Sequence, residues 1–164
     1  MDFEIIQMTW WFLIDIVMAY KGKYSVKDIT KYVGNPTKVI YRSLWERRFM
    51  VFCDTNKKIL KWSSESIVVP YVSPVDKKPH RYFVDFIIEY VDKSGEHLTT
   101  LIEIKPKKQC SEPTRKKRIT KSFIKEMLRW EVNQAKWESA TKYATQRGWD
   151  FKILTEKELL IGNQ

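Results

Sequence analysis

The sequence predicts one α/β domain, of the α+β kind, in which a mixed β-sheet is flanked by helices. Three observations favour this fold class: an amphipathic helical pattern early in the chain, strand-like segments in its middle, and a long helical pattern followed by a last strand. The 164 residues suffice for one ordinary hydrophobic core, and no internal repeat indicates a solenoid.

The composition narrows the class of protein. Apolar residues make up 43% of the chain and charged residues 30%, a balance typical of a packed globule rather than of a disordered or fibrous chain. Lysine and arginine exceed the acids by 30 to 20, as is common in proteins that contact phosphate backbones. The two cysteines have no Cys or His neighbours at metal-ligand spacing, so we expect a reducing compartment and neither a zinc site nor a disulfide scaffold.

Residues 1–19 form an apolar N-terminal segment without a basic start, so a signal peptide is not expected. Three interpretations stay open: a helix that covers part of the core or a partner surface, a membrane-associated segment, and sequence translated upstream of a true start at Met18. Glu4 and Asp15 disfavour the second, because a carboxylate in mid-membrane costs about 2.5–3.5 kcal/mol. The domain itself is expected to cover residues 20–164.

A first helix is expected early in this domain. From Lys38 to Asp54 the apolar residues recur with mostly helical spacing and alternate with arginines. Gly34-Asn35-Pro36 is a turn signal, and Thr37 after it is a suitable N-cap. The pattern predicts an amphipathic helix that carries Glu46.

Strands are expected next. β-branched and aromatic residues predict strands over residues 59–72, Tyr82 to Val91 and Leu98 to Ile104. Residues 73–79 predict a turn, and residues 92–96 have the composition of a hairpin loop between the second and third strands. The sequence therefore predicts a β-meander.

Three more segments complete the domain. Residues 105–121 hold eight Lys or Arg against one acid and are broken by two prolines, which indicates a flexible basic loop. Ile119 to Arg147 has a helical pattern and ends before Gly148, which is suited to the C′ position. Trp149 to Leu154 predicts a last, buried strand.

Two carboxylates, Asp85 and Glu103, are predicted within apolar strands, where charged side chains are rare without a function. Folding the hairpin about Ser94 places Asp85 opposite Glu103 or one residue from it. The period of two along a strand puts Glu103 and Lys105 on the same face. The three side chains are therefore expected to converge, although an ordinary solvated strand face is the alternative interpretation.

This convergence favours metal chemistry. Two carboxylates held close together repel each other unless a cation lies between them, and their hard oxygen atoms favour Mg²⁺, with Mn²⁺ as the second choice. A lysine beside the cation stabilises charge at an attacked phosphorus or positions the attacking water. These groups together predict hydrolysis of phosphodiester bonds.

Four sequence blocks resemble the TnsA-like endonucleases of the PD-(D/E)xK nuclease superfamily. The blocks are Arg42-Ser43-Leu44-Trp45-Glu46-Arg47-Arg48-Phe49, His80-Arg81-Tyr82-Phe83-Val84-Asp85-Phe86, Leu101-Ile102-Glu103-Ile104-Lys105-Pro106 and Gly148-Trp149-Asp150-Phe151. The proline that usually precedes the aspartate is Val84 here, at a position that carries no metal ligand. The resemblance covers roughly residues 20 to 160, and within the family it is most similar to nucleases that complete the heads of large tailed phages.

The resemblance implies a restriction-endonuclease-like fold and a Mg²⁺-dependent endodeoxyribonuclease that acts on duplex DNA with little sequence specificity. It implies a late step of head assembly, after DNA packaging, with capsid, portal or neck proteins as partners and no small-molecule cofactor. The expected location is the cytoplasm of the infected bacterial host or the virion. Two other functions stay open: a structural head or neck factor that grips DNA without cutting it, and a recombination or repair nuclease.

The resemblance also implies residue roles. Asp85 and Glu103 would be the principal metal ligands, Glu46 would complete the metal site from its helix, and the Ile104 carbonyl would be a further ligand. Lys105 would act near the water or the phosphate, which makes Glu46, Asp85, Glu103 and Lys105 the expected catalytic set. Clustered cations supply most non-specific affinity for DNA. The expected DNA contacts are Lys107, Lys108, Arg115, Lys116, Lys117, Arg118, Lys121 and, on the following helix, Gln134.

Overall fold

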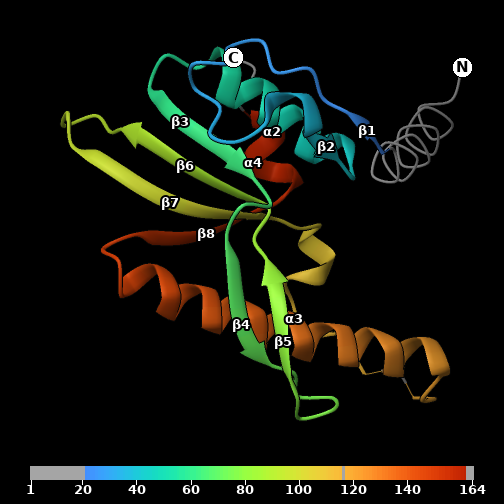
Figure 1. Cartoon of the computed structure of the whole chain (residues 1–164). Coiled ribbons are helices and arrows are strands. Elements are labelled where there is room, and N and C mark those ends of the chain that lie inside the picture. Colours follow the sequence, from blue (N-terminus) through green and yellow to red (C-terminus); the bar gives the residue numbers. More distant parts are fainter. Residues whose placement is uncertain (1–20, 116, 162–164) are drawn as a thin grey trace, which may run out of the picture.

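A four-stranded mixed sheet forms the centre of the computed structural model, which describes residues 21–115 and 117–161 (Figure 1). Two pairs of short strands and three α-helices surround this sheet in the described ranges. The elements in chain order are β1 (Gly22–Lys23), the 3-10 helix η1 (Pro36–Lys38), β2 (Ile40–Tyr41), α2 (Leu44–Thr55), β3 (Ile59–Ser64), β4 (Val68–Val72), β5 (Pro79–Phe83), β6 (Phe86–Val91), β7 (His97–Ile104), the 3-10 helix η2 (Lys107–Gln109), α3 (Lys121–Thr145), β8 (Asp150–Leu154) and α4 (Glu156–Ile161).

The strand order across the central sheet is β3-β6-β7-β8. β3 pairs with β6 and β6 with β7 in antiparallel fashion, whereas β7 and β8 are parallel. β6 and β7 form the hairpin expected about Ser94, and the parallel pair is connected through α3, because parallel neighbours need a long crossover. The predicted fold class, a mixed sheet flanked by helices, is confirmed.

The strand predicted from Tyr82 to Val91 is in fact two strands. β5 pairs with β4 in a separate hairpin, while β6 belongs to the central sheet, and Val84 and Asp85 link the two. Tyr82, Val84 and Phe86 are all buried, so the alternation continues through the break, although Phe86 packs into a different core cluster from the other two. The strand predicted over residues 59–72 is likewise divided, into β3 and β4.

The first helix begins later than the sequence pattern predicts. Asn35 caps the short helix η1, β2 follows, and α2 starts after its N-cap, Ser43, so the prediction of Thr37 as N-cap is wrong. Ser43 Oγ accepts a 3.2 Å hydrogen bond from the backbone N–H of Glu46, and the side chain of Glu46 reaches back towards the cap. This Ser-x-x-Glu capping box is the stronger start signal.

The C-terminal part follows the prediction more closely. α3 occupies most of the predicted helix, and Gly148 follows it with φ of 70°, in the left-handed region that glycine tolerates best. β8 forms where a strand was expected, but Asp150 and Lys152 are exposed because β8 is the last strand of the sheet, so the prediction of a buried strand is wrong. The short helix α4 was not predicted.

The sheet separates two core clusters. Phe86 and Ile102 point towards α2, whereas Ile87 and Leu101 point towards α3 and the β4–β5 hairpin. Figure 1 shows the same division, with α2 and α4 at one end of the molecule and α3 with the hairpin at the other. Because side chains alternate along a strand, Glu103 shares the α3 side with Leu101.

The expectations for residues 1–19, including a start at Met18, lie outside the described residues. Within residues 21–115 and 117–161, no helix combines the length and the apolar character needed to cross a membrane.

Candidate active site

Asp85 lies beside the end of β7, at the link between β5 and β6. The β6–β7 register places Phe86 opposite Ile102, so the next pair outward is Asp85 and Glu103. Asp85 Oδ2 accepts a 2.8 Å hydrogen bond from the backbone N–H of Ile104, which fixes the carboxylate against β7. The structure therefore brings Asp85 next to Glu103, as the hairpin register predicted.

Glu103 is a buried carboxylate, with 2% of its surface exposed. Lys105 Nζ lies 2.7 Å from Glu103 Oε1 in an ion pair on the same face of β7. The hydroxyl of Tyr82 donates a 2.6 Å hydrogen bond to Oε2, so each carboxylate oxygen has a partner. Such pairing offsets part of the free energy that burying a carboxylate costs.

The electrostatics of the site reflect burial and close charges. Burial and then the charge of Glu103 raise the pKa of Asp85 well above its usual range. Burial lowers the pKa of Lys105, but Glu103 and Asp85 raise it more, so the net shift is upward and the lysine is charged. Burial and the neighbouring Glu103 raise the pKa of Tyr82, which keeps its hydroxyl a donor. Burial and the nearby Glu103 thus disfavour a negative charge on Asp85 unless a further cation is present, because Lys105 balances only part of the charge.

Glu46 approaches the same centre from the first turn of α2. Its Oε2 accepts a 2.8 Å hydrogen bond from the backbone N–H of Arg42, and its Oε1 a 3.1 Å bond from Ser43 Oγ. Burial raises the pKa of Glu46, while the bond from Arg42 opposes the shift. Its charge acts on both Asp85 and Lys105, so the helix brings the predicted third carboxylate near the site while also using it as a cap.

Comparison with known proteins shows the family of the chain. A sequence profile described as the N-terminal part of the TnsA-like endonucleases matches residues 56–156, which include Asp85, Glu103 and Lys105. The chain belongs to the TnsA-like endonuclease family. It is 42% identical over 146 residues to the head completion nuclease of Enterobacteria phage T4, and the alignment covers 87% of this chain and 95% of the phage protein. No solved structure is significantly similar to the chain.

The donor groups of this TnsA-like site fit a hard divalent cation. Asp85 and Glu103 supply carboxylate oxygens, which Mg²⁺ and Mn²⁺ prefer. The N–H and C=O of one strand residue point to the same side, so the Ile104 carbonyl faces the side on which Asp85 lies. In the described part of the chain, no three side chains of Asp, Glu, His or Cys gather closely enough to be a metal cluster. Asp85, Glu103 and the Ile104 carbonyl are therefore the groups here that could hold a cation, and metal binding by them and by Glu46 stays a prediction.

Lys136 was not predicted to face the site, but the structure brings it there. From α3 its Nζ lies 5.5 Å from the ring centre of Tyr82 and 5.7 Å from that of Tyr71. Burial and the charge of Lys105 lower the pKa of Lys136, while Glu103 and Asp85 act in the opposite direction. A lysine among the apolar positions of a helical pattern was the signal that could have revealed it. The TnsA-like site thus has a second cation.

Gln134, the predicted contact on α3, is exposed. It precedes Lys136 by two residues, about 200° around the helix, and so lies on a different face. The buried neighbour Asn133, three residues before Lys136, shares the face turned towards the site. A DNA contact by Gln134 stays a prediction.

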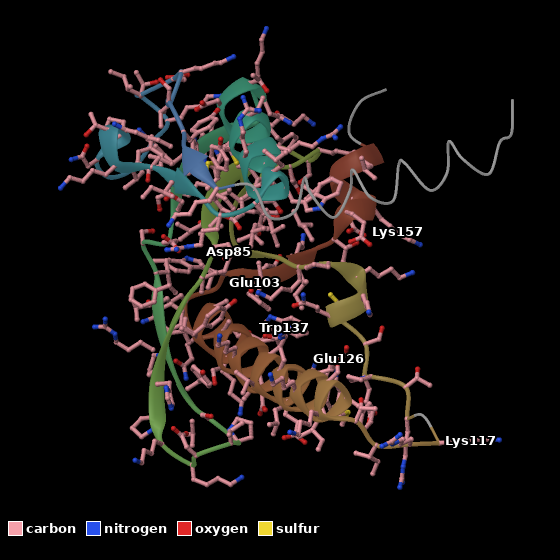
Figure 2. All side chains as sticks on the ribbon, turned by 90° about the vertical axis from the view of Figure 1, so that its right-hand side faces the viewer. Asp85, Glu103, Lys117, Glu126, Trp137 and Lys157 are labelled. Carbon is pink, nitrogen blue, oxygen red and sulfur yellow. The ribbon has the colours of Figure 1, made fainter. Side chains whose placement is uncertain are left out.

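The predicted basic residues of the loop are exposed wherever the structure describes them, and Lys116 lies outside the described residues. Lys117 stands at the outer end of the loop in Figure 2, far from Asp85 and Glu103. Nearer the site, the backbone N–H of Lys107 bonds to Glu156 of α4, and Lys157 lies close enough to lower the pKa of Lys107. Lys157 is therefore a further cation near Lys107 that the sequence pattern did not include among the candidates for DNA contact. The described DNA-contact candidates in this loop are Lys107, Lys108, Arg115, Lys117, Arg118 and Lys121.

Proposed function

We propose that this chain is a divalent-metal-dependent DNA endonuclease that acts in phage head completion, after DNA packaging. The observation that carries the proposal is the meeting of Asp85 with the Glu103 and Lys105 pair at the end of β7, in a chain of the TnsA-like endonuclease family. The similarity to a phage head completion nuclease supports the assembly step, and with it a head, portal or neck protein as partner in the cytoplasm of the infected host.

The residues of the site have different roles in the proposed hydrolysis of a phosphodiester bond. A divalent cation held by Asp85, Glu103 and the Ile104 carbonyl, Mg²⁺ in this proposal, would lower the pKa of a coordinated water and neutralise phosphate charge. Glu103 orients Lys105 through their 2.7 Å ion pair, and Tyr82 holds Glu103 from the other side. Water adds its oxygen to phosphorus, one P–O bond breaks, and the leaving oxygen takes a proton.

Lys105 and Lys136 offset the repulsion between the carboxylates of the site and a DNA phosphate. A phosphodiester carries a negative charge, and the carboxylates at Asp85, Glu103 and Glu46 repel it. Lys105 and Lys136 face the same centre from β7 and α3 and attract the phosphate from two sides. The exposed cations of residues 107–121 extend this attraction along the DNA backbone without reading its sequence.

Nicking of supercoiled plasmid tests the proposal. The wild type is compared with Asp85→Asn and Glu103→Gln, which keep the size of each side chain, in Mg²⁺, in Mn²⁺ and in EDTA. We expect nicking that needs the metal and is lost in both variants, while DNA binding persists. Glu89→Gln is the matched control, because Glu89 is an exposed carboxylate in the same sheet.

Two outcomes would contradict the proposal. Normal nicking by both variants places the chemistry elsewhere. DNA binding without nicking in either metal, also after addition of head proteins, favours instead a structural factor that grips DNA.

A further inference from the structure

A cavity of about 500 Å³ lies beside the proposed active site, between residues 108–114 and α3. Its volume is in the range of pockets that enclose small ligands. Glu126, Arg129, Trp130 and Asn133 form its helix side, and we call it the loop–helix pocket.

The buried amide of Asn133 indicates that the pocket takes a ligand. Asn133 is 5% exposed, and its Nδ2 has no hydrogen-bond partner among the residues that the structure describes. Buried polar groups are almost always paired, because an unpaired donor costs free energy. Asn133 also lines the loop–helix pocket, so a rotation of its side chain would let this amide donate to an acceptor atom of a ligand there.

Two lining residues of the pocket, Lys108 and Asn133, each lie three residues along the chain from a lysine of the proposed site, Lys105 and Lys136. Glu126, Trp130, Asn133 and Lys136 follow one another at spacings of three or four residues, which places them in one row on a helix. Figure 2 shows Glu126 and Trp137 of α3 on the side of the molecule where Glu103 lies. Lys136 lies six positions after Trp130, about 9 Å further along the helix axis.

The lining has the chemistry of a nucleotide site. Trp130 is half-buried and offers an aromatic surface for stacking a base. Arg129 and Lys108 are exposed cations suited to a phosphate, whereas the Asn133 amide and the Glu126 carboxylate suit the acceptors and amino groups on a base edge. An acidic peptide would gain less than a nucleotide, because it has no base to stack on Trp130.

We propose that the loop–helix pocket binds one unpaired nucleotide of a DNA strand whose neighbouring phosphates lie in the catalytic site. The preferred substrate is then duplex DNA with a single-stranded end or flap, rather than a continuous duplex. A continuous duplex cannot enter a cavity bounded by a loop on one side and a helix on the other, but a single unpaired nucleotide can. This inference rests on the proposed function and names the form of its DNA substrate.

Binding measured in EDTA tests the inference independently of cleavage. Fluorescence anisotropy compares a blunt hairpin duplex with the same duplex carrying a short single-stranded tail, at the 5′ or the 3′ end. We expect the full-length protein to bind a duplex with one of the two tails about tenfold more tightly than the blunt duplex, as the stacking of a single base on an aromatic ring provides.

Substitutions at three positions of α3 test whether the tail binds in the loop–helix pocket. Trp130→Ala should remove most of the tail preference and Trp130→Phe should keep it. Asn133→Ala should weaken tail binding without lowering the thermal unfolding midpoint, because it removes an amide that is unpaired among the described residues. Arg129→Gln should weaken tail binding more than Lys142→Gln, which removes an equal charge from the opposite face of α3.

The outcomes are distinguishable. Equal binding of blunt and tailed duplexes by the wild type overturns the inference and leaves the endonuclease proposal intact. A tail preference that survives Trp130→Ala and Asn133→Ala also overturns it, because the tail is then held elsewhere. If the wild type binds none of these DNAs, the proposed function itself is contradicted.

Discussion

Tyr82 and Glu103 connect the β4–β5 hairpin to the central sheet through a 2.6 Å hydrogen bond. The bond is buried, and its acceptor also forms the ion pair with Lys105. The hairpin therefore does more than cover α3. It fixes the orientation of the carboxylate on which the proposed metal site and the lysine both depend.

Tyr82→Phe tests this positioning. The variant keeps the ring beside Lys136 but leaves Glu103 short of one donor, so we expect unfolding to cost about 1–3 kcal/mol less. Cleavage should fall, and the metal concentration for half-maximal nicking should change, because the carboxylate is no longer held. Denaturant unfolding and a metal titration of plasmid nicking measure the two effects. Tyr90→Phe, on β6, is the control, and an unchanged metal dependence in Tyr82→Phe would show that the bond is structural only.

The sequence pattern predicts the convergence of the catalytic candidates on the β6–β7 hairpin, but it does not predict the side chains that contact them. Asp85, Glu103 and Lys105 are related by strand periodicity and one hairpin register, and both are local properties of the chain. Tyr82 and Lys136 meet them only because the β4–β5 hairpin folds against α3. Contacts of that kind depend on tertiary packing, which a periodic pattern does not contain.

The same reasoning explains the errors in the predicted boundaries of strands and helices. The alternation of buried residues runs through Val84, so the break between β5 and β6 leaves no trace in the pattern. Val39 is an apolar residue at helical spacing, yet it packs in the core just before β2 and outside α2. The capping box at Ser43 was the local signal that places the true start of α2.

Glu46→Gln separates the cap function of Glu46 from its charge. The glutamine keeps a side-chain oxygen for the Arg42 N–H, so the stability of α2 should be nearly unchanged. If the carboxylate helps to hold the metal, nicking should require a higher metal concentration and recover as the metal is added. The readouts are the unfolding midpoint and the metal titration.

Ser43→Ala is the matched variant for the cap. It should lower stability by about 0.5–2 kcal/mol, the usual contribution of an N-cap side chain, with a smaller change in metal dependence. If Glu46→Gln nicks plasmid like the wild type at every metal concentration, Glu46 serves the helix alone.

Lys136→Met tests the second cation. The methionine keeps the apolar stem between the rings of Tyr71 and Tyr82 but removes a half-buried ammonium, so the fold should tolerate it. Nicking should fall by about 10²–10³-fold, the usual effect of losing one group that stabilises transition-state charge. Single-turnover rates at saturating metal measure the change. Lys142→Met is the control, because Lys142 is exposed and lies about 120° around α3 from Lys136. Equal rates for both variants would remove Lys136 from the site.

Neutralising Lys116, Lys117 and Arg118 to glutamine tests the basic loop. Each phosphate contact that is lost should reduce the slope of log K against log salt by about 0.9 on duplex DNA, with weaker binding to every sequence. The control changes Lys57, Lys58 and Lys93 to glutamine, an equal loss of charge at the end of β6 away from Asp85. Anisotropy titrations over a range of salt concentrations give both slopes. If the loop variant keeps the wild-type slope while the control flattens it, DNA lies along the other end of the sheet. The distance of Lys117 from Asp85 in Figure 2 makes this comparison decisive, because only a long stretch of bound DNA reaches both.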